Sequence, residues 1–204
     1  MLVIAAAAVD EGVAELAQSL GELGPTLLLT PGGDAAPGGA AAVAAADLTT
    51  PEGAARDWPA VEEKHGPTES LVTLPSPVPS SPTKVADVTD DLWSACLRDN
   101  LFVAMHAARG AAPAMIERGH GRIAMVTWRL DDPAGYVALA AATGAVRHLA
   151  RTLASEVGEQ GVTVNAVSVA PGRLRDAAPA IRLLRSPDGG FVTSENLSPV
   201  GVTP

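Results

Sequence analysis

The chain has 204 residues, of which 47% are apolar and 3% aromatic, and its formal net charge at pH 7 is −9. This length allows one hydrophobic core built mainly from Ala, Val and Leu, so we expect a single domain over residues 1–204. The acidic balance argues against sequence-independent binding to nucleic acid or to an anionic membrane surface, because both need clustered Lys and Arg.

The N-terminal run MLVIAAAAVDEG is apolar but has no basic flank and is interrupted at Asp10. It is too short for an export signal or a membrane span, and it predicts a first, buried strand instead. Cys96 is the one cysteine, so a disulfide framework or a thiolate metal cluster within one chain is excluded. We therefore expect a protein of the reducing cytoplasm.

Apolar runs of strand length alternate with segments of helical period, a pattern typical of parallel βαβ units. Strands are expected at 2–7, 25–30, 41–46, 70–74, 121–127, 162–169 and 191–197, and helices at 10–21, 51–65, 89–118 and 136–159. The sequence therefore predicts an α/β fold: a Rossmann-like, doubly wound, mostly parallel seven-stranded sheet flanked by helices.

Two connections in this series have no helical pattern. The segment PGGDAAPGGA, residues 31–40, is rich in Gly and Pro, although a parallel crossover normally carries a helix. The segment PSPVPSSPT, residues 75–83, must be an irregular loop, because Pro removes backbone donors and disfavours helix in the residue before it.

Three segments of the second half carry a family resemblance. They are LWSACLRDNLFVAMHAARGAAPAMIERGHGRIAMVT, ATGAVRHLARTLASEVGEQGVTVNAVSVAPGRL and GGFVTSENL, with Trp93, Asn100, Pro113, Met115, Pro171 and Gly172 as particular signs. In this order and spacing they resemble the short-chain dehydrogenase/reductases over roughly half the chain. The resemblance implies the same doubly wound fold and, in intact members, oxidation or reduction with NAD or NADP.

The first half follows the family's plan without its cofactor motifs. The family's TGxxxGxG fingerprint, which lets diphosphate approach backbone at a helix N-terminus, is AAAVDEGV here, residues 6–13. Ala6 and Asp10 stand at degenerate positions and Gly12 is out of register. The carboxylates of Asp10 and Glu11 would then stand where the diphosphate should lie and would repel it. The resemblance therefore implies no bound dinucleotide.

The other cofactor positions also depart from the family. The second strand ends in TPG, residues 30–32, where the family has the residue that reads the adenosine ribose, and TLPS at 73–76 replaces its NNAG motif. Asp47 matches the Asp that the family sets near the adenine. A helix-capping or turn role for an Asp before TTPE is the alternative interpretation, and the one we favour.

The family's reaction uses a Tyr, a Lys four residues later, a Ser and an Asn. The resemblance places Leu139 at the Tyr position, Thr143 at the Lys position and Trp128 at the Ser position, and only Asn100 matches. We therefore expect no catalytic residues in this chain.

Nearby hydroxyl groups do not replace the missing set. Tyr136 lies three residues before the Tyr position with Ala140 one turn on, so a rim or packing role is favoured. Thr127 comes one residue early, and strand alternation aims its hydroxyl elsewhere. The stretch after Gly172 is also short, and RLRDAAPAIRLLRS allows one short helix where the family carries a longer substrate lid.

The two long helices, 89–118 and 136–159, are well patterned. In the family they form a four-helix bundle with the same pair of a neighbour, and small side chains at 138–145 would allow close approach. The alternative is that Ala simply favours helix. His106 and His148 lie on these helices; we expect solvated or interface positions and no metal site, because neither has a second ligand at i+4.

The leading hypothesis is a catalytically inactive subunit that binds no nicotinamide and assembles, through helices 89–118 and 136–159, with an intact short-chain dehydrogenase/reductase or with itself. NAD or NADP would then be bound by the partner. One alternative is an active NAD(P)-dependent oxidoreductase with an atypical proton donor, Tyr136 or water. Another is a cofactor-free homo-oligomer that binds a small molecule in a cleft lined by Trp128, Leu139 and Thr143.

Overall fold

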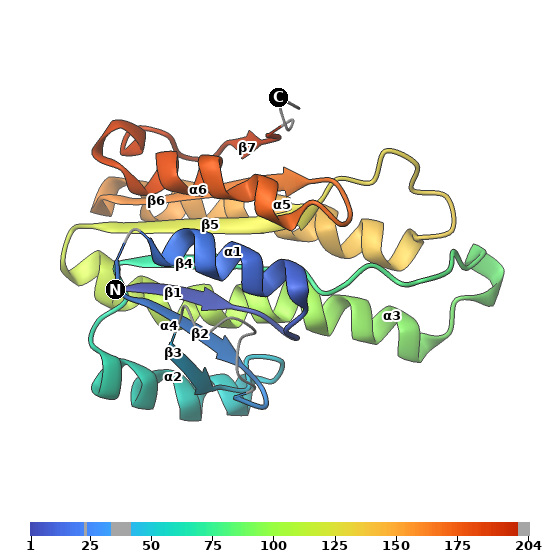
Figure 1. The fold of residues 1–204 in the computed structure, drawn as a ribbon, viewed down its shortest axis with the longest axis horizontal. Helices are drawn as coiled ribbons and strands as arrows, with labels where there is room; N and C mark the ends of the chain where they lie inside the picture. Colours follow the sequence, from blue (N-terminus) through green and yellow to red (C-terminus); the bar gives the residue numbers. More distant parts are fainter. Residues whose placement is uncertain (23, 34–41, 200–204) are drawn as a thin grey trace.

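A computed structural model describes residues 1–22, 24–33 and 42–199. These residues form a seven-stranded sheet in the order β3-β2-β1-β4-β5-β6-β7, with every neighbouring pair parallel (Figure 1). The strand order reverses between β1 and β4, which makes their carboxyl ends the topological switch point. The strands are β1 (Leu2–Ala5), β2 (Thr26–Thr30), β3 (Ala42–Ala45), β4 (Ser70–Thr73), β5 (Gly121–Trp128), β6 (Val162–Val169) and β7 (Asn196–Leu197).

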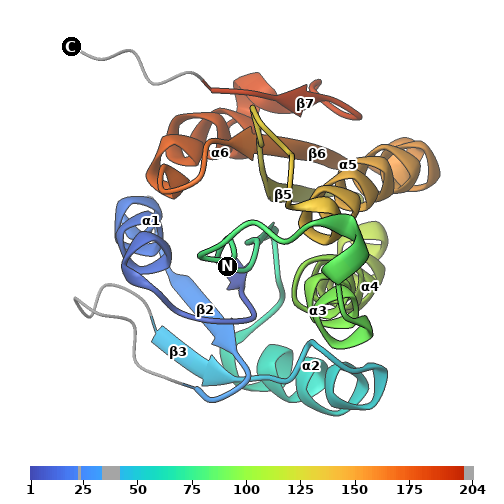
Figure 2. The same cartoon turned by 90° about the vertical axis from the view of Figure 1, so that its right-hand side faces the viewer.

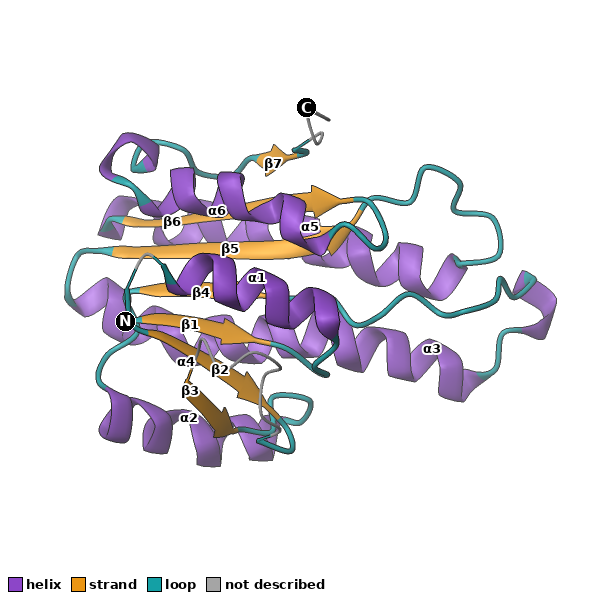
Figure 3. Ribbon diagram, viewed as in Figure 1, coloured by secondary structure: helices purple, strands orange, loops and turns teal. Residues whose placement is uncertain are grey.

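Apart from the connection between β2 and β3, most of which lies outside the described residues, helices connect the successive strands, as the predicted α/β fold requires (Figure 3). They are α1 (Glu11–Gly21), α2 (Pro51–His65), α3 (Asp90–Cys96), α4 (Val103–Glu117), α5 (Val137–Val157) and α6 (Ala177–Arg185). A π-helical segment, Leu97–Phe102, joins α3 to α4, so the helix predicted at 89–118 contains one widened turn in which the amide of Val103 donates to the carbonyl of Arg98.

Two layers of helices enclose the sheet (Figure 2). Helices α1 and α6 cover one face, and α2, α4 and α5 cover the other. Neighbouring residues of a strand enter different cores: Ile4 packs with the α1 and α6 side, and Val3 packs with the α2, α4 and α5 side. Burial on both faces agrees with the continuous apolar runs of strands such as β1 (LVIA) and the middle of β2 (TLLLT).

Side-chain caps set the starts of three helices. Asp10, Thr50 and Thr89 each accept a hydrogen bond from an amide of the first turn of α1, α2 and α3, respectively. Such caps satisfy amides that have no partner within the helix. The predicted starts at 10, 51 and 89 are therefore confirmed to within one residue.

The last predicted strand, 191–197, is mostly wrong. Only Asn196 and Leu197 pair with β6, and Phe191 is 85% exposed. Ser194 adopts a left-handed φ of 68°, which interrupts extended backbone before β7. The one short helix predicted after Gly172 is confirmed as α6. Most of the irregular segment predicted at 31–40, and position 41, where the third predicted strand begins, lie outside the described residues.

Among the helices of the described residues, none is both long enough and apolar enough to cross a membrane.

Helices α2 and α4 approach each other closely at Gly110. A Cβ placed on Gly110 would overlap the Trp58 ring, with its Cε2 atom at 2.9 Å. Trp58 is 4% exposed, so its rigid ring has no free space to enter. The absence of a side chain at Gly110 is therefore what allows the indole to fill the space between these helices.

We expect Gly110→Ala to lower the free energy of unfolding by about 1–3 kcal/mol, because overpacking against a buried ring outweighs the roughly 1 kcal/mol by which Ala favours helix. Gly158→Ala is the matched control, since Gly158 has helical φ and ψ and its Cβ would meet nothing within 4 Å. Urea unfolding of both variants measures the difference. Equal stabilities would contradict this account of the α2 and α4 contact.

Candidate functional site

The carboxyl ends of β1 and β4 mark the place where a doubly wound sheet binds its ligand. Here the first turn of α1 is capped by its own chain, since Asp10 Oδ1 accepts from the amide of Val13 at 2.9 Å. A Cβ on Gly12 would lie 3.4 Å from that oxygen and 3.5 Å from Leu174 Cβ. A carboxylate and a leucine from the turn after β6 therefore stand at the helix start, where an anion would otherwise be favoured.

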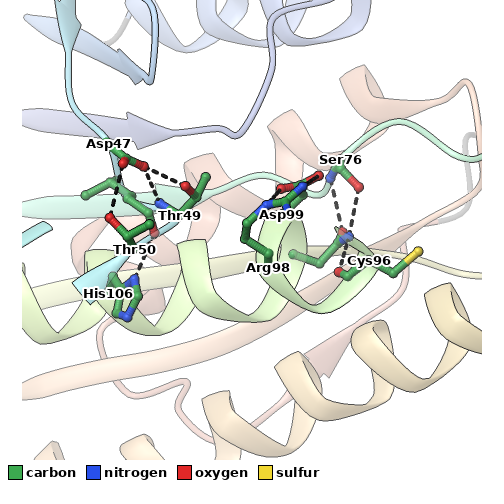
Figure 4. A network of polar contacts seen from close by, with 10 residues as sticks. Asp47, Thr49, Thr50, Ser76, Cys96, Arg98, Asp99 and His106 are labelled. Carbon is green, nitrogen blue, oxygen red and sulfur yellow. Dashed lines mark hydrogen bonds and ion pairs between the residues drawn. The ribbon is translucent and has the colours of Figure 1, made fainter. Parts of the chain in front are cut away.

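Asp47, after β3, is held by the turn that leads into α2 (Figure 4). Its Oδ1 accepts from the amide of Thr49 at 2.9 Å and from the Thr49 hydroxyl at 2.6 Å, and its Oδ2 accepts from the Thr50 hydroxyl at 3.1 Å. The hydrogen bond from the Thr49 hydroxyl, followed by those of the Thr49 amide and Thr50, lowers the Asp47 pKa against the effect of burial. This is the turn role that the sequence left as an alternative, and Thr50 is the helix cap.

His106 corrects an expectation from the sequence. It is 2% exposed, and its Nδ1 lies 2.9 Å from the carbonyl oxygen of Leu48, to which it donates (Figure 4). The ring therefore ties α4 to the loop after β3 and is not solvated, whereas His148 is exposed. Within residues 1–22, 24–33 and 42–199, no group of three or more His, Cys, Asp and Glu side chains is arranged to hold a metal ion.

The α5 positions that the resemblance assigns to proton transfer are buried. Leu139 is 1% exposed and Thr143 is 3% exposed. The Thr143 hydroxyl donates to the carbonyl of Ala140 at 3.0 Å, one turn back on its own helix. Neither side chain exchanges protons near neutral pH, and Thr143 already has an internal partner.

The two nearby hydroxyl residues, Thr127 and Tyr136, make contacts within the fold. Thr127 points to β6, where its Oγ1 lies 3.0 Å from Ser168 Oγ, in agreement with the predicted alternation. Tyr136 is the residue that precedes α5, and it is half-buried against the apolar cluster on the α1 and α6 side.

Asn100 and Trp128 both bind Ser76, in the segment that follows β4. Asn100 Oδ1 accepts from the Ser76 amide at 3.1 Å, and its Nδ2 donates to the Ser76 hydroxyl at 2.8 Å and to the carbonyl of Cys96 at 2.9 Å (Figure 4). Trp128 Nε1 donates to the Ser76 carbonyl at 2.7 Å. The residues at the family's Asn and Ser positions thus fix the chain's own loop.

Very little space remains at this edge of the sheet. Between the described side chains of Thr73, Asn100 and Thr143 there is no volume that a water molecule can occupy. A cavity of about 10 Å³, close to the space for one water, lies between the 75–83 segment and the helices α3 and α5. Cys96 borders this cavity, and burial raises the pKa of its thiol.

The structure thus brings Asn100 and Thr143 to one filled space and Trp128 and Leu139 to one apolar cluster. It leaves Asp10 and Asp47 in contact with their own turns. Sequence reasoning missed the part played by Ser76 and Leu174. The Pro spacing in 75–83 was the available signal for a stiff segment, but it did not indicate where that segment lies.

Comparisons with known proteins agree with this architecture. A family model described as short chain dehydrogenase matches residues 3–178. A solved structure described as a 3-oxoacyl-reductase from Bacillus thuringiensis superposes with a TM-score of 0.83 at 19% identity, covering 100% of this chain and 98% of that chain. One described as a short-chain dehydrogenase/reductase from Burkholderia xenovorans also gives 0.83 at 20% identity, covering 98% and 94%. At these identities the likeness concerns the fold.

Curated relatives match at higher identity over part of their length. D-beta-hydroxybutyrate dehydrogenase of Rhizobium meliloti (strain 1021) is 33% identical over 130 residues, which is 62% of this chain and 48% of that protein. The 3-oxoacyl-(acyl-carrier-protein) reductase MabA of Mycobacterium tuberculosis (strain ATCC 25618 / H37Rv) is 30% identical over 162 residues, or 77% and 62%. The chain therefore spans less than two thirds of either relative.

The lowered pKa of Asp47 predicts a pH dependence. A carboxyl group whose pKa is lowered by folding stabilises the protein above its unfolded pKa, about 3.9, and this stabilisation is lost as the pH falls through the folded value. Asp47→Asn should therefore be less stable than the parent by about 1 kcal/mol at pH 7, with the difference shrinking below about pH 4.

Urea unfolding from pH 7 to about pH 2 checks this prediction, because the range has to extend below the lowered folded pKa. Thr49→Val removes the hydroxyl whose hydrogen bond lowers the Asp47 pKa most. The stability of this variant should therefore fall less than that of the parent as the pH is lowered, as expected for Asp47→Asn. A difference between Asp47→Asn and the parent that stays constant over this range would show that the ionised carboxylate contributes nothing specific.

Proposed function

The chain belongs to the short-chain dehydrogenase family, and from that premise we propose that it is a catalytically silent, oxidoreductase-like subunit. It assembles through α4 and α5 with an intact ketoreductase of the same family, in a heterodimer or heterotetramer. The intact subunit binds NAD or NADP and carries out the reaction. This chain supplies structure and binds no dinucleotide itself.

The observation that carries the proposal is the pair Leu139 and Thr143 on α5. At the positions where the resemblance expects an ionisable Tyr and Lys, the side chains are aliphatic or hydroxylic, and both are buried. General acid–base catalysis needs a group that gains and loses a proton near the working pH. Tyr136 precedes the helix and is half-buried in apolar surroundings, with Ala140 and not a cation one turn on.

The surroundings of the α1 N-terminus also support a catalytically silent subunit, because they do not fit a dinucleotide diphosphate. Asp10 places a negative charge at the helix start and already accepts from an amide of the first turn. Leu174 stands against Gly12, where the family needs bare backbone. Asp47, the remaining match to an adenine-binding residue, has both carboxylate oxygens bonded within its own turn.

The assembly surface is an apolar groove of roughly 350 Å³ between α4 and α5. It is lined by Met105, Ala108, Arg109, Ala112, Pro113, Ile116, Leu149, Leu153, Glu156 and Val157. Ile116 in this lining is 38% exposed. Arg109 and Glu156 are the charged residues of the lining, so a matching pair of helices buries an apolar surface and pairs two opposite charges.

The names of the curated relatives support the choice of partner. One is a hydroxybutyrate dehydrogenase and another a 3-oxoacyl reductase, and both names describe chemistry that interconverts a hydroxyl group and a ketone. A ketoreductase that carries the same two long helices presents an equivalent surface. A second copy of this chain is the competing occupant, and the assembly experiment below separates the two.

We expect no saturable binding of NADH or NADPH by the purified chain up to about 1 mM, because Asp10 places a carboxylate at the α1 start and Leu174 stands against Gly12 there. Quenching of tryptophan fluorescence during titration measures this, with the intact partner as positive control. Saturable binding in the micromolar range would favour the alternative of an active reductase with an atypical proton donor.

Co-expression with an intact homologue encoded beside it should give a complex that stays together at micromolar concentration. Ile116→Asp should weaken this complex at least tenfold, because it places a charge in the apolar groove. Leu183→Asp is the matched control, since Leu183 is 47% exposed on α6, away from the groove.

Native mass spectrometry of the co-purified material measures both stoichiometry and affinity. Separate elution of the two proteins would overturn the heteromeric proposal. A homo-oligomer of this chain that is sensitive to Ile116→Asp would instead identify a second copy as the occupant of the groove.

A further inference from the structure

The segment after β4 is fixed at its first end by Ser76. Its amide, hydroxyl and carbonyl groups are all hydrogen-bonded, the first two to Asn100 and the third to Trp128. Asn100 is 4% exposed and Trp128 is 5% exposed, so these partners are themselves held by packing. Buried hydrogen bonds of this kind are costly to leave unmade.

The far end of the segment is fixed by the loop before α5. The amide of Thr83 donates to the carbonyl of Gly135 at 2.7 Å. Gly135 has a φ of +81°, and a Cβ there would overlap Pro82, with its Cα at 3.1 Å and the Thr83 amide nitrogen at 3.3 Å. The two backbones can lie together only because Gly135 has no side chain.

The middle of the segment closes the apolar core. Val78 packs against the cluster that contains Leu74, Trp128 and Leu139. Figure 2 shows the segment crossing the carboxyl end of the sheet between α1 and α3. The cavity left beneath it is the one of about 10 Å³ already described.

We propose that residues 75–83 form a strap that occupies the cleft in cis, with Asn100 and Trp128 as its positioning residues. Any ligand of this cleft has to displace the strap first. Four of its nine residues are Pro, at 75, 77, 79 and 82, so the strap loses little conformational entropy when it closes. Closure of the strap does not depend on whether the chain is catalytically silent.

Cleavage by an endoproteinase specific for lysine tests the strap, because Lys64 and Lys84 are the two lysines of the chain. Lys84 follows the strap directly and lies next to Thr83, whereas Lys64 lies in the last turn of α2. Lys84 is itself exposed, but a protease binds several residues on each side of the cleaved bond, so efficient cleavage there requires Thr83 to leave Gly135. Cleavage at Lys64 reports opening elsewhere. The ratio of the two rates therefore separates strap release from global unfolding.

Trp128→Phe removes the bond to the Ser76 carbonyl and keeps an aromatic ring. We expect it to raise the ratio of Lys84 to Lys64 cleavage roughly 3- to 10-fold, the effect of one lost hydrogen bond on a local opening equilibrium. Thr127→Val is the matched control, because it removes a buried hydroxyl from the neighbouring position of β5 that bonds to Ser168 and not to the strap, and it lies away from α2. The control should leave the ratio within about twofold of the parent.

Gly135→Ala provides a second test at the other end. It should raise the same ratio by about tenfold or more, because the new methyl group displaces Pro82. Gly172→Ala is its control, with a similar φ of +72° and nothing within 4 Å of the new Cβ. If both glycine variants raise the ratio equally, backbone strain and not strap displacement is the cause, and the proposal fails.

Two further outcomes are decisive. Cleavage of the parent at Lys84 as fast as in an unfolded peptide of the same sequence would mean that the strap is not closed in solution, and the proposal would be overturned. If Trp128→Phe accelerates both cleavages alike, it acts through the whole fold, and the difference between the Gly135 and Gly172 variants then supports or overturns the strap.

Discussion

Ser76 is bonded through its amide, its hydroxyl and its carbonyl, and the partners come from the long helix α3–α4 and from β5. With all three groups fixed, the chain that leaves β4 can continue only across the end of the sheet. The closed cleft, the burial of Leu139 and Thr143, and the packing of Val78 on the core all depend on that path. Asn100 and Trp128 belong to regular elements, so the path is set by the rigid part of the fold.

A common pattern runs through the polar groups of this edge: their partners come from the same chain. Asp10 binds an amide of α1, Asp47 binds its own turn, and Thr143 binds the carbonyl of Ala140. Polar groups in a ligand site need partners that arrive with the ligand, and buried groups without partners are costly. These three side chains therefore already have partners, whereas the buried hydroxyl of Thr30 at the end of β2 has none among the described residues. The architecture is therefore kept by hydrophobic burial on both faces, independently of what the edge can bind.

Much of the fold was predictable because it depends on local signals. The run 162–169 is rich in Val and forms β6 over those same residues. The caps Asp10, Thr50 and Thr89 start their helices where their side chains accept hydrogen bonds from amides. What failed depends on contacts between distant residues. The burial of His106 follows from the carbonyl of Leu48, 58 positions away, and the bonds of Ser76 reach 24 and 52 positions along the chain. Periodicity carries no signal for such pairs, nor for the left-handed Ser194 that shortens β7.

The widened turn at Leu97–Phe102 links two features that look separate. An α-helix advances about 100° per residue, so the extra residue in a π-turn rotates everything after it by that angle. The turn contains Asn100, which reaches Ser76, and it is followed by α4, whose Ile116 faces outward. Loss of one residue from this turn would swing Ile116 by more than a quarter of a circle and withdraw the Asn100 amide together with it. The position of Asn100 and the orientation of the outer helical surface thus share a single helical phase, and a deletion within this turn would change both.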